Sequence, residues 1–210
     1  MGSLAGMSGR RYIAFEGAEG CGKSTQAARY AERVGAILTR ETGGTQIGAR
    51  LREILHDTSV EGMSNRAEAL IAAADRAQHL SEVVRPALDA GRSVVSDRSV
   101  FSTLAYQGYG RGLPVDEVRS INDWATNGLW PDLVVLIDAP EHTIAQRMAR
   151  RRLDRFEAAG PAFHHRVISG FRAMAAADPV RWVTVTAVGS IDEVAAAIAD
   201  AIDRHLEATP

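Results

Sequence analysis

The sequence predicts a three-layer α/β domain in which a parallel five-stranded sheet is flanked by helices. Short apolar segments such as 93–97 and 133–138 alternate with segments of helical periodicity, and this alternation is typical of a parallel sheet covered on both faces. A glycine-rich turn at 17–24 separates the first apolar segment from the first helical one. That strand–turn–helix order is the setting in which backbone N–H groups bind phosphate.

Apolar patterning places five strands along the chain, at 11–16, 36–39, 93–97, 133–138 and 183–186. Helices are expected at 24–34, 46–56, 64–90 and 191–206. Thr45 is a good N-cap for the second helix, and Gly91 ends the third. One side of the third helix should be buried, and it carries Ala69, Leu70, Ala73, Ala77, Leu80, Val84 and Leu88.

Composition excludes several classes of protein. Lysine and arginine (24) nearly balance aspartate and glutamate (26), giving a net charge of −2, so general nucleic-acid binding is not expected. No apolar run reaches the ~18 residues that cross a membrane, and one cysteine cannot form an intrachain disulfide. We therefore expect a cytoplasmic protein. Residues 1–9 should be a disordered leader or an expression scar, leaving 10–210 as a single domain.

The turn at 17–24 fits the phosphate-loop pattern G-x-x-x-x-G-K-[ST] at every fixed position. Its lysine, Lys23, is the only lysine in the chain, and a compact ammonium suits the charge between β- and γ-phosphates. Cys21 is expected to be a small residue of a tight turn rather than a reactive thiol. The predicted ATP-binding residues are Gly17, Ala18, Glu19, Gly20, Cys21, Gly22, Lys23, Ser24 and Thr25.

A magnesium ion is expected beside this loop. The Ser24 hydroxyl is the first expected ligand, and a carboxylate at a strand end should be the second. Asp97 and Asp138 both follow apolar strands. Asp138 precedes Ala139-Pro140 and is explained as a helix cap, so Asp97 is the favoured ligand.

Arginines concentrate in the segment 147–160, which we expect to be a lid. Arg147, Arg151 and Arg155 are spaced by four, so a helix would place them on one face, and Arg150 and Arg152 flank them. A solvated helix face is the alternative interpretation. In a chain that binds a triphosphate, we favour a mobile basic lid that stabilises the transferred phosphoryl group.

More charged residues lie near the predicted strand ends, where ligands of open α/β sheets bind. These residues are Glu16, Arg40, Glu41, Arg76 and Arg98, and their arginines suggest a second phosphorylated substrate. A phosphate acceptor needs positioning and charge neutralisation but no base. A hydroxyl acceptor would need a carboxylate base, either Glu16 or Glu41. The segment 106–112 is expected to be a glycine-rich loop.

Together these motifs resemble the thymidylate kinase family, whose members phosphorylate dTMP with ATP. FEGAEGCGKST is similar to the family's phosphate loop and RETGGT to its REPGGT turn. Further similar segments are AADRAQH, SDRSVFSTLAYQGYGRG, WPDLVVLIDAP and RRRLDRFE. The resemblance spans about residues 11–206. It implies the P-loop nucleoside monophosphate kinase fold, ATP with Mg²⁺, dTMP as acceptor, and a homodimer packed through helices such as 64–90.

The resemblance also implies roles for individual residues. Arg98 would hold the dTMP phosphate, Arg76 would contact thymine, and Tyr106 and Gln107 would line the same pocket with Glu41 and Ala72. Glu19 and Asp97 would arrange Mg²⁺. The lid arginines Arg150, Arg151 and Arg155 would act in catalysis with Lys23 and Arg98, as in the bacterial variant of the family.

Two positions depart from the family pattern. Ala72 stands where the family usually has a phenylalanine that stacks on thymine, and Thr42 stands where it has proline. A deoxynucleoside kinase, which also pairs a phosphate loop with a D/E-R-S segment, is the alternative activity. A P-loop switch protein is a third class, but the chain has no N-K-x-D segment for guanine, because Lys23 is its only lysine.

Overall fold

The computed structural model describes residues 9–148 and 154–208, so most of the expected leader lies outside the described part. Five strands form one parallel sheet in the order β2-β3-β1-β4-β5. The strands are β1 (Tyr12–Glu16), β2 (Ile37–Arg40), β3 (Val94–Asp97), β4 (Leu133–Asp138) and β5 (Trp182–Thr186). The predicted five-stranded parallel sheet is therefore confirmed.

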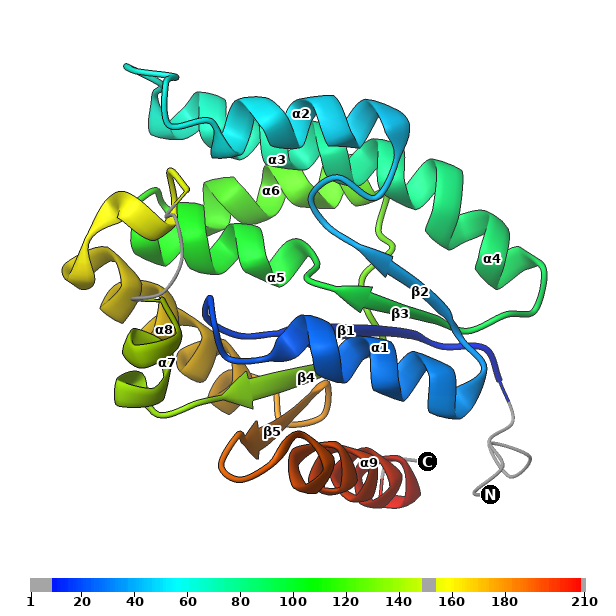
Figure 1. Cartoon of the computed structure of the whole chain (residues 1–210). Coiled ribbons are helices and arrows are strands. Elements are labelled where there is room, and N and C mark those ends of the chain that lie inside the picture. Colours follow the sequence, from blue (N-terminus) through cyan, green and yellow to red (C-terminus); the bar gives the residue numbers. More distant parts are fainter. Residues whose placement is uncertain (1–8, 149–153, 209–210) are drawn as a thin grey trace.

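Helices cover both faces of this sheet (Figure 1). One face carries α1 (Lys23–Val34) and α9 (Ile191–Ala208). The other carries α2 (Gln46–His56), α3 (Asn65–His79), α4 (Arg85–Asp89), α5 (Val100–Thr103), α6 (Val115–Thr126) and α8 (Pro161–Ala177). The short helix α7 (Glu141–Met148) follows β4. Within the two described stretches, no helix has the length and apolar composition that a bilayer crossing needs.

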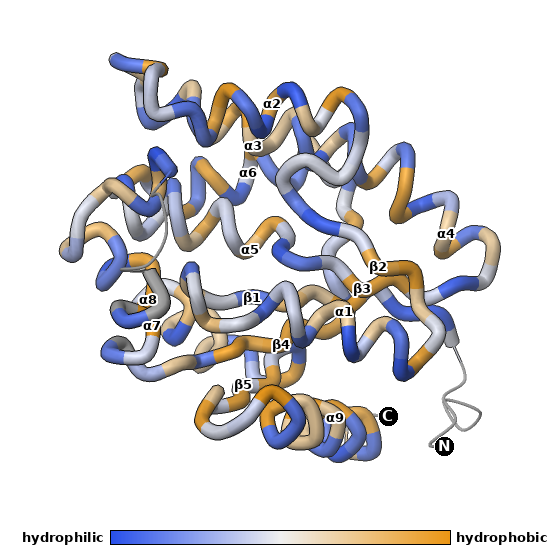
Figure 2. Tube along the Cα trace, in the orientation of Figure 1, coloured by the Kyte–Doolittle hydropathy of each residue, from blue (hydrophilic) through white to orange (hydrophobic). Residues whose placement is uncertain are grey.

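The core has two halves, one on each face of the sheet. Side chains along each buried strand contribute to the two halves alternately, because successive side chains point to opposite faces. In β4, Leu133, Val135 and Ile137 pack with α1 and α9, whereas Val134 and Leu136 pack with the helices of the opposite face. Figure 2 shows apolar stretches along the strands and mixed polarity along the helices. The sheet is thus apolar on both sides, as the continuous apolar runs predicted.

The helix expected at 64–90 exists but is interrupted by a π-helical turn, Leu80–Val84, between α3 and α4. Ser64 is its N-cap and accepts a hydrogen bond from the Ala67 N–H. The expectation that Leu70 is buried is wrong, because this side chain is 54% exposed. Consecutive helical residues are about 100° apart, so Leu70 does not share the buried face of Ala69.

The segment 106–112 is largely helical rather than a loop. Residues Leu104–Gly110 form a second π-helical turn after α5. A Cβ atom on Gly110 would lie 2.6 Å from the Phe163 ring and 2.8 Å from Val167, both in α8. The glycine therefore permits close packing of two helical segments, and it does not serve a turn. π-Helical turns of this kind are frequent at functional sites.

Of the two predicted helix caps, one is confirmed. The Thr45 hydroxyl accepts a hydrogen bond from the Gly48 N–H at 2.9 Å, at the start of α2. The prediction for Asp138 is wrong. Its carboxylate instead binds Arg172 of α8 through two hydrogen bonds of 3.0 and 2.9 Å, and the first turn around α7 closes on the Pro140 carbonyl.

Candidate active site

The phosphate loop, Arg40 and Asp97 meet at the carboxyl edge of the sheet. Phe15 pairs with Asp97 across β1 and β3, and Arg40 pairs with Asp97 across β2 and β3. This register places the segments that follow β1, β2 and β3 next to one another. Because ligands of open α/β sheets bind beyond this edge, the arrangement defines the candidate site.

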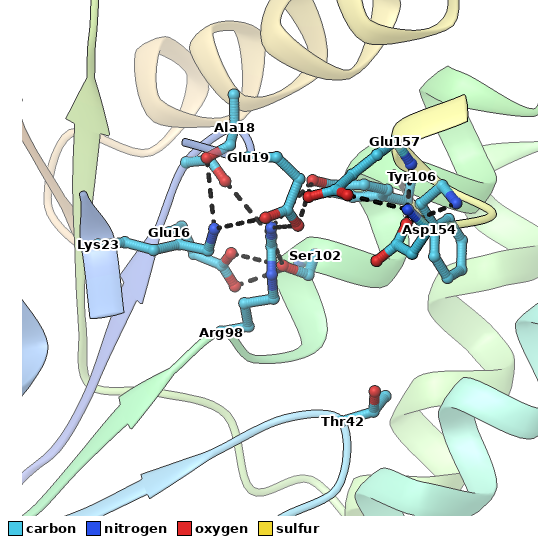
Figure 3. Close-up of polar contacts among 12 residues, drawn as sticks. Glu16, Ala18, Glu19, Lys23, Thr42, Arg98, Ser102, Tyr106, Asp154 and Glu157 are labelled. Carbon is cyan, nitrogen blue, oxygen red and sulfur yellow. Dashed lines mark hydrogen bonds and ion pairs between the residues drawn. The ribbon is translucent and has the colours of Figure 1, made fainter. Parts of the chain in front are cut away.

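Lys23 is turned inward at the first position of α1. The preceding Gly22 adopts a left-handed conformation with φ 99°, which glycine adopts without strain. The Lys23 side chain is buried, and its Nζ lies 3.3 Å from the Ala18 carbonyl oxygen and 3.5 Å from Glu19 Oε2 (Figure 3). The ammonium group is therefore held inside the loop by two oxygens that a phosphate can replace.

Two cavities meet at Lys23. The first has a volume of about 300 Å³ and the second about 470 Å³. Glu19, Lys23 and Ser24 border both cavities. The second cavity is lined by residues 19–25 of the phosphate loop and the start of α1, and by Ala187, Gly189, Ser190 and Ile191 where β5 leads into α9. Two molecules placed in these cavities would approach each other at the Lys23 ammonium.

Arg98 reaches the first cavity from a strained backbone position between β3 and α5. Its φ is 74°, in the left-handed region that favours glycine, and such strain is concentrated at functional sites. Its Nη2 donates to the Tyr106 hydroxyl at 2.9 Å and forms an ion pair with Glu19 (Figure 3). Burial opposes the charge, but Glu19 and the other acidic groups nearby raise the pKa of Arg98 well above its ordinary value.

Glu19 and Asp97 differ as candidate metal ligands. Burial alone would raise the pKa of Glu19, but Arg98 and Lys23 outweigh it and hold that pKa well below its usual range. The Glu19 carboxylate is thus a charged partner of two cations. Asp97 borders the first cavity together with Ser24, and its buried Oδ1 has no hydrogen-bond partner among the described residues. An unpartnered carboxylate oxygen in a residue that lines the same cavity as the Ser24 hydroxyl fits a magnesium ion.

Within residues 9–148 and 154–208, no group of three or more His, Cys, Asp or Glu side chains is arranged to hold a metal ion. A metal at Ser24 and Asp97 would therefore draw its remaining ligands from phosphate oxygens and water, as magnesium does.

Cys21 is buried, and that burial raises the pKa of its thiol. The thiol stays protonated at neutral pH, in agreement with the structural role expected for it.

Glu16 is buried, and both of its carboxylate oxygens accept hydrogen bonds. Its Oε1 accepts from the Ser99 backbone N–H and hydroxyl, both at 2.8 Å, and its Oε2 accepts from the Ser102 hydroxyl at 2.6 Å. Burial raises its pKa, against the lowering effect of Arg98 and of these donors. Glu16 therefore fixes the start of α5 below Arg98, and it does not present a free oxygen as a base.

Glu41 and Arg76 form a buried ion pair at the floor of the first cavity. Arg76 Nε donates to Glu41 Oε2 at 2.8 Å, its Nη2 donates to the Ser99 carbonyl at 3.0 Å, and its Nη1 bonds Asn122. His79 Nδ1 lies 2.8 Å from Glu41 Oε1. Burial would raise the pKa of Glu41, but Arg76 and His79 outweigh it and lower that pKa. Glu41 thus acts first as an anchor for Arg76.

Replacing Glu41 by glutamine is expected to reduce the free energy of unfolding by about 3 kcal/mol at pH 7, because Arg76 keeps its charge in a buried site without a counterion. The folded-state pKa of Glu41 lies below its unfolded value of about 4.3, so this stabilisation is complete above about pH 5 and is lost as the pH falls. Urea unfolding should show that the difference in the free energy of unfolding between wild type and Glu41→Gln is smaller at pH 4 than at pH 7. The exposed Glu32→Gln is the control, and an equal gap for Glu41→Gln at both pH values would contradict this account.

The other predicted acceptor-site residues also border the first cavity. Tyr106 and Gln107 come from the π-helical turn after α5, and Ala72 comes from α3. Gln107 Nε2 donates to Glu68 Oε1 at 2.8 Å. The residues that the sequence predicted for the acceptor site come from α3, β3 and the segment after α5, and the fold brings them to one cavity.

The lid arginines are only partly described. Arg150 and Arg151 lie outside the described residues. Arg155 lies in a turn, so the expected helical alignment does not extend to it. Its Nε donates to the Leu55 carbonyl at 2.8 Å, and its Nη1 lies 2.7 Å from Glu68 Oε2. In this conformation Arg155 attaches the described part of the expected lid segment to α2 and α3. Its expected contact with the transferred phosphate stays a prediction.

Sequence reasoning missed Arg52 and the segment 187–191. Arg52 borders the first cavity, and its Nη1 donates to the Thr42 carbonyl at 3.2 Å. Arg40 and Arg98 line the same cavity, and burial, followed by the charges of these two arginines, lowers the pKa of Arg52. Arg52 could have been predicted from its position seven residues after the Thr45 cap, two turns along the same side of α2. Residues 187–191 could have been predicted from the Ser190-x-x-Glu193 capping box.

Comparison with known proteins decides the family. The family model described as "Thymidylate kinase" matches residues 15–198. The chain belongs to the thymidylate kinase family. It is 42% identical over 208 residues to a thymidylate kinase of Desulfovibrio desulfuricans, which covers 93% of this chain and 96% of the relative. It is 47% identical over 201 residues to one from a Synechococcus species, which covers 93% and 95%.

A solved thymidylate kinase structure supports the same assignment. The enzyme from Ehrlichia chaffeensis superposes with a TM-score of 0.74 at 29% identity, covering 93% of this chain and 99% of the other. The P-loop nucleoside monophosphate kinase fold expected from the motifs is therefore confirmed, as is the resemblance to the family. The chain is an ATP-dependent nucleoside monophosphate kinase.

Proposed function

We propose that the chain transfers the γ-phosphoryl group of ATP to dTMP, giving dTDP for dTTP synthesis. The observation that carries this proposal is the shared border of the two cavities at Lys23 and Ser24. ATP occupies the cavity lined by the phosphate loop, and dTMP occupies the cavity lined by Arg98. The names of the relatives agree with this pair of substrates.

Phosphoryl transfer needs little from the protein beyond placement and charge. A dTMP phosphate oxygen forms a bond to the γ-phosphorus while the bond to the β–γ bridging oxygen breaks, and ADP leaves. The acceptor oxygen is already an anion, so no base is required. Lys23 neutralises charge on the moving group as its contacts with the Ala18 carbonyl and Glu19 give way to phosphate oxygens.

The acceptor phosphate lies among Arg98, Arg52 and Arg40. Arg98 is the main ligand, since a guanidinium presents paired donors that match phosphate oxygens. Arg76, Tyr106, Gln107, Glu41 and Ala72 surround the sugar and base. Arg76 is already oriented by Glu41, Asn122 and Ser99, so thymine meets a guanidinium whose direction is fixed in advance.

Magnesium would be held by the Ser24 hydroxyl and the Asp97 carboxylate. When bound, the ion would supply positive charge that offsets the negative charge of the ATP phosphates. Glu19 fits this role less well than Asp97, because its oxygens already pair with Arg98 and Lys23. Instead Glu19 pairs with both cations and neutralises part of their charge until phosphates arrive.

The lid arginines complete the charge balance. Arg150 and Arg151 stabilise the charge on the transferred group, and Arg155 joins them if it exchanges Glu68 for a phosphate oxygen.

We also propose a cytoplasmic homodimer without nucleic-acid or membrane partners. Large apolar side chains exposed on three neighbouring helices support a protein interface, namely Ile47 and Ile54 of α2, Leu70 of α3 and Trp124 of α6.

The deoxynucleoside kinase alternative is not favoured. It requires a carboxylate that takes a proton from a hydroxyl, but both oxygens of Glu16 and of Glu41 are already occupied by buried donors. Three arginines converging on the cavity instead match an acceptor that carries a phosphate.

A coupled assay that follows ADP release, with dTMP or thymidine as acceptor and ATP·Mg²⁺ as donor, tests the function. We expect rapid turnover with dTMP and only background turnover with thymidine. Robust turnover of thymidine with none of dTMP would overturn the proposal. With γ-labelled ATP, the label should appear in dTDP.

A further inference from the structure

The first cavity is lined by two chemically different sets of residues. The charged set includes Lys23, Arg40, Arg52, Asp97 and Arg98. The apolar set is Leu55, Ala72 and Phe156, which share one hydrophobic cluster with Tyr106. A nucleotide that places its phosphate against the charged set has the apolar set available for its base.

Phe156 is the apolar aromatic ring available to such a base. Three rings border the cavity in the described part of the chain: His56, Tyr106 and Phe156. His56 Nδ1 is engaged by Asp154 Oδ2 at 2.7 Å. The Tyr106 hydroxyl is bonded to Arg98, whose guanidinium also lies 4.9 Å from the centre of the Tyr106 ring. Ala72 contributes only a methyl group.

The Phe156 ring is held in place by contacts on several sides. Asp154 Oδ1 accepts hydrogen bonds from the backbone N–H groups of Phe156 and Glu157, both at 2.9 Å. The Arg155 guanidinium lies 4.9 Å from the ring centre, and the His56 ring meets it edge-on at 5.2 Å. The ring is 8% exposed. It is therefore a fixed wall of the cavity and not a freely rotating surface side chain.

We propose that Phe156 forms the aromatic wall against which the pyrimidine base of the acceptor packs, and that Asp154 positions it. This inference rests on the proposed function, since it requires that the acceptor nucleotide occupies the first cavity. The base-binding ring thus comes from the described part of the expected lid segment, residues 154–160, while α3 contributes only the Ala72 methyl group to that wall. Acceptor binding is consequently linked to the docking of that segment on α2 and α3.

Binding of two probes distinguishes a base contact from a structural effect. The probes are dTMP and 2-deoxyribose 5-phosphate, which has the phosphate and sugar but no base. Phe156→Leu should raise the Kd for dTMP about fivefold, because the stacking surface is lost. The inhibition constant of 2-deoxyribose 5-phosphate, measured in competition with dTMP, should change less than twofold. The KM for ATP should also change less than twofold, and Phe156→Tyr should restore the wild-type Kd for dTMP.

A matched control separates this effect from loss of core packing. Phe163 packs on the same Tyr106 ring at 6.0 Å and is buried, but it does not border the cavity. Phe163→Leu should lower the melting temperature without changing the Kd for dTMP more than twofold. If Phe156→Leu weakens both probes equally, or weakens neither, Phe156 is not a base contact and the inference is overturned.

The positioning role of Asp154 has its own test. Asp154→Ala should raise the Kd for dTMP in the wild-type background. In the Phe156→Leu background, Asp154→Ala should raise the Kd for dTMP little further, because the two changes remove the same contact. If the two substitutions instead have fully additive effects on the binding free energy of dTMP, Asp154 does not act through Phe156. The activity of the wild-type enzyme with dTMP is measured before any variant is compared. If the wild type fails to phosphorylate dTMP, the proposed function itself is wrong.

Discussion

Replacing Lys23 by methionine is expected to lower kcat about 1000-fold. Methionine keeps the length and apolar stem of the side chain but removes the ammonium that faces both cavities. Electrostatic groups aimed at a developing charge contribute on the order of 10²- to 10³-fold each in enzymes, and here the group lies where the γ-phosphate must pass. The KM values for ATP and dTMP should change much less than kcat, because the charge is needed most in the transition state.

Steady-state kinetics with both substrates varied, on protein whose melting temperature is close to that of the wild type, measures this effect. Arg29→Met is a suitable control. Arg29 lies on the same helix, α1, and neither it nor its exposed ion-pair partner Asp192 borders either cavity, so kcat should stay within about twofold. A Lys23→Met enzyme that keeps more than a tenth of the wild-type kcat would contradict the role assigned to this ammonium.

Replacing Arg98 by alanine is expected to lower kcat/KM for dTMP about 1000-fold. The variant loses the main ligand of the acceptor phosphate and leaves Glu19 paired with Lys23 alone, so a negative charge faces the incoming anion. Arg98→Lys should recover only part of the loss, because an ammonium lacks the paired donors of a guanidinium. The KM for ATP should rise by no more than about threefold.

The specificity of the Arg98 effect can be measured with the slow ATP hydrolysis that occurs without an acceptor. That background rate should be nearly the same in the wild type, Arg98→Ala and Arg98→Lys, because Arg98 itself does not line the donor cavity. Equal losses in the background rate and in dTMP phosphorylation would mean that Arg98 serves the donor side or the fold, and not the acceptor.

The sequence was informative wherever a local pattern has one structural solution. Continuous apolar runs predicted the five strands, and the phosphate-loop pattern predicted the turn after β1 and the inward position of Lys23. Asp97 and Arg98 could be placed at the site because Asp97 ends β3 and Arg98 follows it, and the carboxyl ends of parallel strands meet at one edge.

Features that depend on distant partners could not be predicted. Gly108 and Gly110 indicated a loop, yet their lack of side chains serves close packing on Val115 and on Phe163 of α8. Asp138 had a local explanation as a cap, but Arg172, far along the chain, provides its partner. Phe156 joins Ala72 at one cavity only because Asp154 and Arg155 dock on α2 and α3. No local pattern encodes such tertiary contacts.

A crystal structure with dTMP and a non-hydrolysable ATP analogue bound together tests the central claim most directly. We predict the triphosphate on the phosphate loop, the dTMP phosphate against Arg98 and Arg52, and Lys23 Nζ within hydrogen-bond distance of the terminal phosphate on the line between them. If dTMP instead binds elsewhere, or if the Lys23 ammonium points away from both nucleotides, transfer between the two cavities is ruled out.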